Sequence, residues 1–168
     1  MDIHTLRLSH RLPRDERIST HVAMVARAFG AKGMTYTGQH DSSLEESLNK
    51  ICGNWGGSFP VTHEKSYKKV ISNYKKQGFE IIHLTMYGTP VQKMKKPKKA
   101  LVIVGSEQVP ADVYHLADQN ISVTNQPHSE VAALAIALDR LNGMAHEFKG
   151  KIKIMPSKSG KHVVKTDL

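Results

Sequence analysis

The chain has 168 residues, 39% of them hydrophobic and 23% charged, which are the values of one globular domain with its own core. Its 24 lysines and arginines against 15 acidic residues give a net charge of +9, which suits a polyanionic partner. The single cysteine, Cys52, excludes an internal disulfide and every metal site built from several cysteines, and it indicates a reducing cytoplasm.

In the first half of the chain, apolar periodicity alternates between strands and helices. We expect strands at 3–8 and 34–37, helices at 17–29 and 43–52, a glycine-rich turn running into a strand at 55–61, and an amphipathic helix at 64–78. Ser19 or Thr20 is the expected N-cap of the first helix. Gly30 and Gly78 stand where helices are expected to stop.

The second half is more regular. We expect strands at 79–87, 100–105 and 120–124, helices at 111–117 and from 130 to about 142, and two basic strands at 151–155 and 162–165. Nearly continuous apolar runs are typical of buried parallel strands. The pattern predicts an α/β domain with a mainly parallel sheet flanked by helices over residues 1–150, followed by a basic β-hairpin-like extension over 151–168.

No membrane span or signal peptide is expected. The longest apolar run, 131–138, is far shorter than the roughly 20 residues that a membrane span needs. The first residues also lack the apolar segment and the cleavage site of a signal peptide. A cytoplasmic protein is therefore expected.

Three loops follow apolar strands of the expected sheet. They are MYGTP (86–90), GSEQVP (105–110) and TNQPHS (124–129). Because ligands of open parallel sheets bind beyond the carboxyl ends of the strands, these loops predict a binding site. Asn125, Gln126 and Ser129, with the free N–H groups at the helix start, could bind an adenine edge, a ribose or a carboxylate. Ser129 is also the expected N-cap of the helix that follows.

Several common chemistries have no matching motif. The sequence contains neither the GxxxxGK[ST] of a P-loop nor the GxGxxG of a dinucleotide fold. HSE at 128–130 matches half of a zinc deaminase signature, but a chain with one cysteine cannot supply the PCxxC half. The ten histidines lack the spacing of HExxH, so no metal is expected. The ligand class that remains is a nucleotide-like molecule that binds without a phosphate-binding loop.

The helix that begins near residue 130 is apolar on nearly every side, as EVAALAIALDRL shows. A helix that is apolar all round is covered all round. One sheet covers only one face of it, so we expect a second subunit to cover the rest, in a homodimer.

Five segments carry a resemblance that spans residues 7–165. They are HVAMVARAFGA (21–31), NWGGSFPV (54–61), HLTMYG (83–88), IVGSEQVP (103–110) and VTNQPHSEVAALA (123–135). In this order they resemble the archaeal tRNA cytidine 2′-O-methyltransferases, S-adenosylmethionine enzymes of the SPOUT superfamily. The resemblance implies a dimer with a deep trefoil knot near the C-terminus, which methylates the ribose 2′-hydroxyl of cytidine 56 in the T-loop of tRNA.

The resemblance also implies that three knot loops hold the cofactor. The expected cofactor-binding residues are Leu84, Gly105, Ser106, Glu107, Gln108, Val109, Val123, Thr124, Asn125, Gln126, Pro127, His128, Ser129 and Glu130. Gln108 departs from the family, which more often has lysine there, so a charge at this position is not carried over.

Arg27 is the expected catalytic residue, because it matches an arginine of the family that stands six residues after a polar side chain, here His21. The family's arginine is thought to activate the 2′-hydroxyl. Since a guanidinium stays protonated at neutral pH, we expect Arg27 to orient phosphate and ribose, with the proton passing to phosphate or water. The expected tRNA-binding residues are His21, Trp55, Lys93, Lys95, Lys96, Lys98 and Lys99.

Two other functions stay open at the level of sequence. One is a non-catalytic RNA-binding protein on the same fold, which would account for the positive charge without using the loops. The other is a methyltransferase that acts on a base, on another RNA position or on ribosomal RNA.

Overall fold

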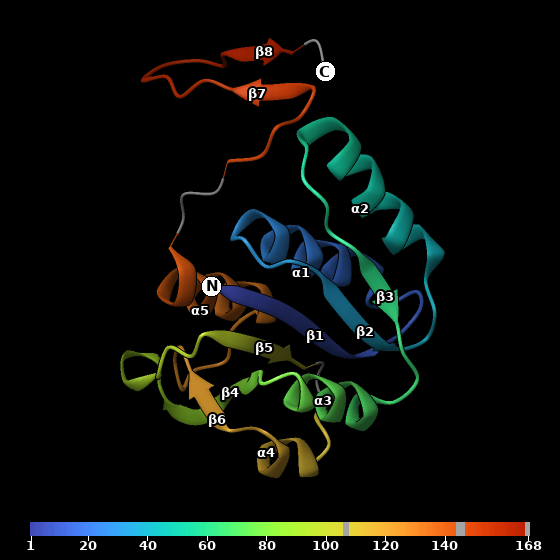
Figure 1. The fold of residues 1–168 in the computed structure, drawn as a ribbon, viewed down its shortest axis with the longest axis vertical. Helices are drawn as coiled ribbons and strands as arrows, with labels where there is room; N and C mark the ends of the chain where they lie inside the picture. Colours follow the sequence, from blue (N-terminus) through green and yellow to red (C-terminus); the bar gives the residue numbers. More distant parts are fainter. Residues whose placement is uncertain (106–107, 144–146, 167–168) are drawn as a thin grey trace.

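A computed structural model describes residues 1–105, 108–143 and 147–166 (Figure 1). Within these ranges the chain forms a six-stranded sheet in the order β3-β2-β1-β5-β4-β6, and every pairing in it is parallel. Its strands are β1 (Asp2–His10), β2 (Met34–Gly38), β3 (Val61–His63), β4 (Glu80–Pro90), β5 (Lys99–Val104) and β6 (Gln119–Ser122). The expected mainly parallel sheet is confirmed.

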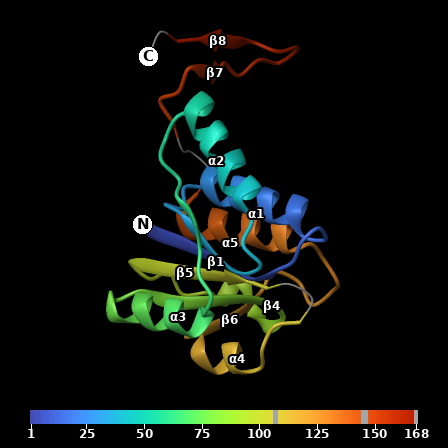
Figure 2. The same ribbon diagram turned by 90° about the vertical axis from the view of Figure 1, so that its right-hand side faces the viewer.

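Helices cover both faces of this sheet (Figures 1 and 2). They are α1 (Glu16–Ala28), α2 (Ser42–Trp55) and α5 (Glu130–Asn142) on one face, α3 (Tyr67–Lys76) and α4 (Asp112–Leu116) on the other, with a 3-10 turn η1 (Val91–Lys93) after β4. Successive strand residues supply the two cores. Ile82 belongs to the core beneath α1, α2 and α5, whereas Ile81 packs with Val70 and Ile71 of α3. Among the described residues no helix is both long and apolar enough to cross a bilayer.

The start of α1 differs from expectation, and neither expected N-cap residue caps the helix. Asp15 precedes α1 without a side-chain capping bond. Ser19 and Thr20 lie inside the helix, because its turns already begin at Asp15, whose carbonyl accepts the Ser19 N–H at 2.9 Å. The buried Ser19 hydroxyl lies 2.6 Å from Nδ1 of His10, and the Thr20 hydroxyl donates to the Glu16 carbonyl. Both hydroxyls are used within the fold.

The end of α2 also lies later than expected. The helix continues to Trp55, and the glycine-rich turn begins only at Gly56 and Gly57, which have φ angles of 81° and 77°. A Cβ on Gly57 would lie 2.6 Å from the Phe148 ring. These glycines therefore let the chain turn sharply where the C-terminal segment packs against it.

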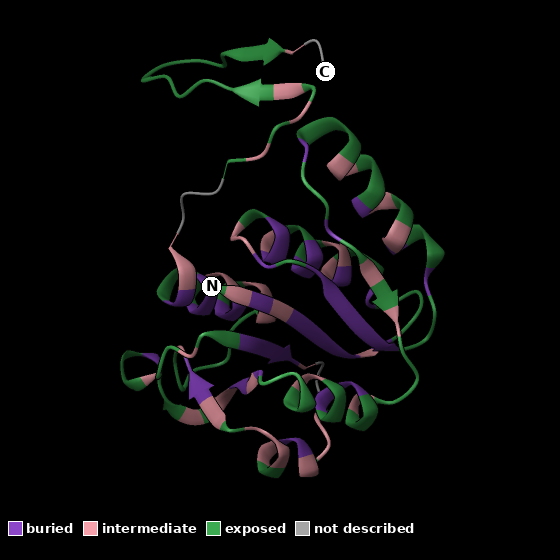
Figure 3. Ribbon diagram, in the orientation of Figure 1, coloured by how far each residue is buried: buried purple, intermediate pink, exposed green. Residues whose placement is uncertain are grey.

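The C-terminal segment forms a separate antiparallel pair, β7 (Ile152–Ile154) and β8 (Val163–Lys165). Most residues of this hairpin are exposed, as Figure 3 shows. The strands agree with the basic hairpin expected from the sequence. The division into a domain at 1–150 and an extension at 151–168 stays a prediction, as does the trefoil knot.

The backbones of β4 and β6 approach each other closely at Gly88. The β4 strand pairs with β6 on both sides of an irregularity, since Leu84 and Thr89 both pair with Ile121. A Cβ on Gly88 would lie 2.6 Å from backbone atoms of Asn120 and Ile121. No residue larger than glycine fits this position without a shift of the backbone.

Gly88→Ala is therefore expected to lower the free energy of unfolding by about 1–3 kcal/mol, the usual range for overpacking. Gly53→Ala is the control, because no heavy atom lies within 4 Å of its added Cβ in α2. Alanine should stabilise that helix by roughly 0.5–1 kcal/mol. Urea denaturation followed by circular dichroism should show midpoints that shift in opposite directions. A Gly88→Ala midpoint equal to that of the unmodified protein would contradict the close approach.

Candidate functional site

A cleft of about 440 Å³ lies at the carboxyl end of β5, beside residues 84–86 of β4 and the start of α5. The expected loop at 86–90 is part of β4, so the cleft brings together this strand and the two loops that follow β5 and β6. The expected cofactor residues that line it are Leu84, Gly105, Pro127, His128, Ser129 and Glu130. The rest of the described wall comes from Ile18 of α1, Thr85 and Met86 of β4, Val104 of β5 and Ala133 of α5. Segments far apart in the sequence thus converge where ligands of parallel sheets bind.

The other expected cofactor residues that the structure describes do not line the cleft. Asn125 donates through Nδ2 to the carbonyl of Met86 at 2.6 Å, which ties the loop after β6 to β4. The Thr124 hydroxyl accepts the Gln126 N–H at 3.2 Å. Val123 packs on the core beneath α1, α2 and α5, Val109 packs on the opposite core, and Gln108 is exposed. Ser106 and Glu107 lie outside the described residues.

Ser129 is the N-cap of α5, as the sequence predicts. Its hydroxyl oxygen accepts the Val131 N–H at 3.2 Å. His128 donates through Nδ1 to the Gln126 carbonyl at 2.7 Å when that nitrogen is protonated, so its ring is tied to its own loop. The positive end of the α5 dipole therefore faces the cleft from a loop of fixed shape.

A buried ion pair lies behind the cleft wall. Arg7 of β1 has no exposed surface, and its Nη2 donates to Oε1 of Glu130 at 3.0 Å, with Oδ2 of Asp15 at 3.9 Å. Burial raises the pKa of Glu130, and the Arg7 charge opposes that shift. Arg7 was not predicted as a site residue, although the sequence carried a signal, namely a cation inside the apolar strand IHTLRL.

Arg27 is buried at the other end of α1. It donates through Nη2 to the carbonyl of Gly56, and its guanidinium carbon lies 4.2 Å from the centroid of the Phe148 ring. Arg27 lies nine residues after Ile18, a distance of about 14 Å along a helix. The expected catalytic arginine and the cleft of the same chain are therefore not brought together.

Around Arg27 lies a second, larger cavity of about 950 Å³, lined by Trp55, Phe148 and residues of the C-terminal hairpin. Trp55 is 37% exposed there. The close backbone approach at Gly56 and Gly57 serves the packing of residues 148–150. Lys149 and Lys153 also line this cavity, so it combines an aromatic surface with positive charge.

The predicted tRNA-binding lysines lie away from the cleft. Lys99 pairs with Asp2 at the amino end of the sheet, five residues before Val104 at the cleft, which is about 16 Å along a strand. The Lys95 N–H donates to Gln119 at the start of β6. Lys93, Lys96 and Lys98 are exposed in the same connection, and His21 is exposed on α1.

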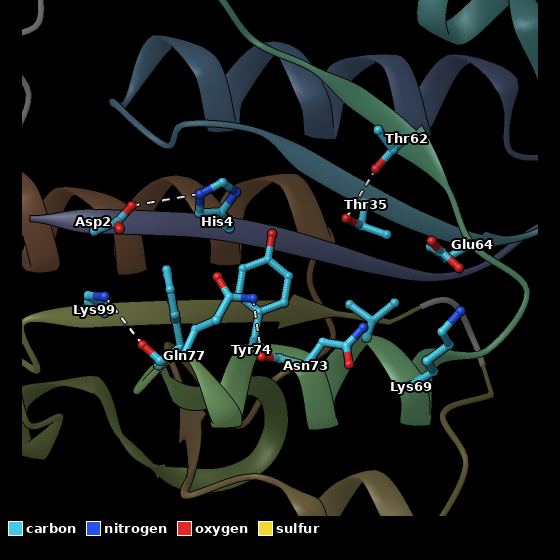
Figure 4. Close-up of a pocket in the computed structure, with 12 residues that line it drawn as sticks. Asp2, His4, Thr35, Thr62, Glu64, Lys69, Asn73, Tyr74, Gln77 and Lys99 are labelled. Carbon is cyan, nitrogen blue, oxygen red and sulfur yellow. Dashed lines mark hydrogen bonds and ion pairs between the residues drawn. The ribbon is translucent and has the colours of Figure 1, made fainter.

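A third cavity, of about 320 Å³, lies between α3 and the β1–β3 part of the sheet (Figure 4). Its polar groups largely contact one another: Asp2 lies 3.7 Å from His4, Thr35 lies 3.3 Å from Thr62, and Lys99 donates to a carbonyl. It opens near the amino ends of β1 and β5, opposite to the end where such sheets bind ligands. The cleft at Leu84 and Glu130 is therefore the better candidate.

Comparison with known proteins agrees with this geometry. Residues 55–164 match the family described as tRNA ribose 2′-O-methyltransferase, aTrm56. The tRNA (cytidine(56)-2′-O)-methyltransferase of Methanosphaera stadtmanae is 49% identical over 175 residues, which cover 98% of this chain and 99% of the relative. That of Methanocaldococcus jannaschii is 49% identical over 176 residues, covering 98% and 97%.

Solved structures with the same fold share little sequence with this chain. The TrmH/SpoU tRNA modifying enzyme of A. aeolicus gives a TM-score of 0.64 at 15% identity, over 83% of this chain and 73% of that chain. The SpoU methyltransferase AviRb from Streptomyces viridochromogenes, in complex with AdoMet, gives 0.64 at 16% identity, over 83% and 56%. They support the fold, and the sequence relatives establish the family. The chain belongs to the tRNA ribose 2′-O-methyltransferase family.

Proposed function

We propose that the protein transfers the methyl group of S-adenosylmethionine to the ribose 2′-hydroxyl of cytidine 56 in the T-loop of tRNA, in the cytoplasm. The observation that carries the proposal is the cleft that β4 and the loops after β5 and β6 form at one edge of the sheet. Its support comes from relatives that bear this activity in their names, at 49% identity over 98% of the chain.

The cleft fits such a cofactor chemically. Leu84, Val104 and Ala133 give it an apolar wall that suits an adenine ring, and the first turn of α5 offers backbone N–H groups. Oε2 of Glu130 is buried without a hydrogen-bond partner among the described residues. S-adenosylmethionine, when bound, supplies a methyl group on a positively charged sulfur, and a carboxylate beside it favours that charge.

Arg27 is proposed to orient the ribose and its phosphate, because methyl transfer needs the nucleophile in line and about 3 Å from the methyl carbon. Its distance from the cleft of its own chain has a consequence. If Arg27 acts in the reaction, it acts at the cleft of a second chain. His21 and Trp55 stay proposed tRNA contacts. The lysines from Lys93 to Lys99 stay proposed contacts as well, but as weak peripheral ones, because they lie at the end of the sheet opposite to the cleft.

An exposed apolar face supports a homodimer. In α5, Ile136 is 45% exposed and Ala132 is exposed, and Met24 of the adjacent α1 is 41% exposed. We expect Ile136→Glu to convert a dimer into a monomer, because it places a charge in the apolar contact. Ser72→Glu adds the same charge on α3, on the opposite face of the sheet, and should leave the dimer intact. Light scattering after gel filtration measures both, and two unchanged masses would exclude this interface.

The activity is tested with tRNA transcripts that carry either a 2′-hydroxyl or a 2′-deoxyribose at cytidine 56. Methyl transfer from labelled S-adenosylmethionine should occur only with the hydroxyl, and nuclease mapping should place the label there. Calorimetry with the cofactor separates the enzyme from a non-catalytic RNA-binding protein. Label at another nucleotide would show that cytidine 56 is not the target. The absence of S-adenosylmethionine binding at millimolar concentration would refute the enzymatic function.

A further inference from the structure

Three arginines lie in the loop from β1 to α1 and in the first turn of α1, at the same end of the sheet as the cleft. Arg11, Arg14 and Arg17 are exposed, and Ile18, which follows them, lines the cleft. Figure 2 shows the starts of α1 and α5 at one end of the sheet. These three residues are named the arginine rim here. Glu16 is the one exposed acid among residues 11–17, so the rim carries an excess of positive charge.

The loop that carries the rim is held in a fixed shape. The buried carboxylate of Asp15 accepts the Arg11 N–H at 3.0 Å and lies 3.5 Å from its Nε. The Asp15 N–H donates back to the Arg11 carbonyl at 2.7 Å. The Leu12 N–H donates to the side chain of Gln39 in the neighbouring loop. A surface ordered in this way loses little entropy when it binds a ligand.

Contacts of alternating charge connect the rim with the cleft. Arg11 is paired with Asp15, Asp15 lies 3.9 Å from Arg7, and Arg7 is paired with Glu130, which lines the cleft. The position of Arg11 is thus fixed relative to the cleft wall through Asp15 and Arg7, which are buried. The lysines at 93–99 have no such connection among the described contacts and lie toward the amino end of the sheet.

We propose that the arginine rim binds backbone phosphates of the tRNA, next to the nucleotide whose ribose enters the cleft. The guanidinium forks of arginine match phosphate oxygens in bidentate hydrogen bonds. Phosphate contacts fix the register of a nucleic acid on a protein without reading its bases. The inference rests on the proposed function, to which it adds the surface that positions the substrate.

The test compares two double variants that each lose two positive charges. Arg14→Gln/Arg17→Gln removes rim charge and spares the Arg11–Asp15 contact. Lys95→Gln/Lys96→Gln removes the same charge from exposed lysines near the amino end of the sheet. The affinity for a tRNA transcript is measured by fluorescence anisotropy across a range of salt concentrations. Calorimetry with S-adenosylmethionine shows whether each variant keeps an intact cleft.

The rim variant is expected to bind tRNA at least about tenfold more weakly, and the slope of log affinity against log salt should fall in magnitude by about two. The lysine variant should change the affinity by less than about threefold, and both should bind the cofactor as before. Equal losses in the two variants, or a larger loss in the lysine variant, would overturn the proposal.

Failure of the proposed function gives a different pattern. The unmodified protein would then bind tRNA without methylating cytidine 56, while the comparison of the two variants would still show where RNA binds. Conversely, normal methylation by the unmodified protein together with full tRNA affinity of the rim variant would refute the rim alone. Loss of cofactor binding in the rim variant would also count against it, since the rim would then serve the cleft's structure.

Discussion

Arg27→Ala is expected to slow methyl transfer by about 100-fold or more, while the affinity for S-adenosylmethionine stays within about twofold. The first effect follows if the guanidinium orients the ribose and phosphate in the reaction. The second follows because Arg27 lies nine residues along α1 from the cleft wall at Ile18. Single-turnover methylation and calorimetry measure the two quantities. Arg27→Lys should not restore the rate, since an ammonium lacks the planar fork that stacks on Phe148.

A structural role for Arg27 predicts another result. Its contacts with Gly56 and Phe148 hold the C-terminal segment against α1 and α2, so their loss could also loosen the fold. Phe148→Leu is the matched control, because it weakens this packing and leaves the guanidinium in place. If both variants lose activity and thermal stability in parallel, Arg27 acts through the fold. A rate loss confined to Arg27→Ala supports a role in the reaction.

A mixed dimer decides which cleft Arg27 serves. One chain carries Arg27→Ala, and the other carries His128→Trp, which places a bulky ring in the cleft wall. If Arg27 acts across the dimer, a mixed dimer keeps one complete site, and a statistical mixture should recover about one quarter of the full activity. If Arg27 acts within its own chain, both sites of the mixed dimer are damaged and the mixture should stay inactive.

The sequence predicted the cleft because the cleft depends on chain order. Apolar runs are followed by polar residues, and parallel strands bring such positions to one edge, which places Leu84 near Gly105 and Glu130. The expected loop at 86–90 was predicted wrongly, since these residues continue β4. The same argument could have predicted at which end of the sheet each basic segment lies. Lys99 opens a strand and must lie at the amino end of the sheet, whereas Arg11 follows a strand and must lie at the cleft end.

Contacts between distant residues were beyond the reach of the pattern. Arg7 and Glu130 are separated by 123 positions, and nothing in either local sequence shows that they meet. The stacking of Arg27 on Phe148 likewise depends on how the C-terminal segment returns to the domain. The N-cap of α1 was predicted wrongly for a local reason, since Ser19 is a good capping residue by type but faces His10 in the core.

Arg7→Met is expected to lower the free energy of unfolding at pH 7 by about 3–5 kcal/mol, the usual result of removing one partner of a buried ion pair. Without the cation, the partly buried Glu130 carboxylate loses its ion-pair partner at 3.0 Å, whereas Asp15 keeps Arg11 at 3.5 Å. Urea denaturation at several pH values measures the loss. The affinity for S-adenosylmethionine should fall as well, because Glu130 loses the contact that holds it in the cleft wall.

The pH dependence separates this ion pair from simple packing. Burial already raises the pKa of Glu130, and removing Arg7 removes the charge that opposes this shift. A carboxyl whose pKa is raised by folding stabilises the fold below its unfolded pKa and loses that contribution as the pH rises. The loss in free energy of unfolding caused by Arg7→Met should therefore be smallest near pH 4.5 and grow toward pH 7. A second substitution, Glu130→Gln, should recover part of the stability at pH 7 and flatten this dependence. A deficit independent of pH, with no recovery in the double variant, would mean that Arg7 acts through its volume alone, and the charged link between the arginine rim and the cleft would lose its basis.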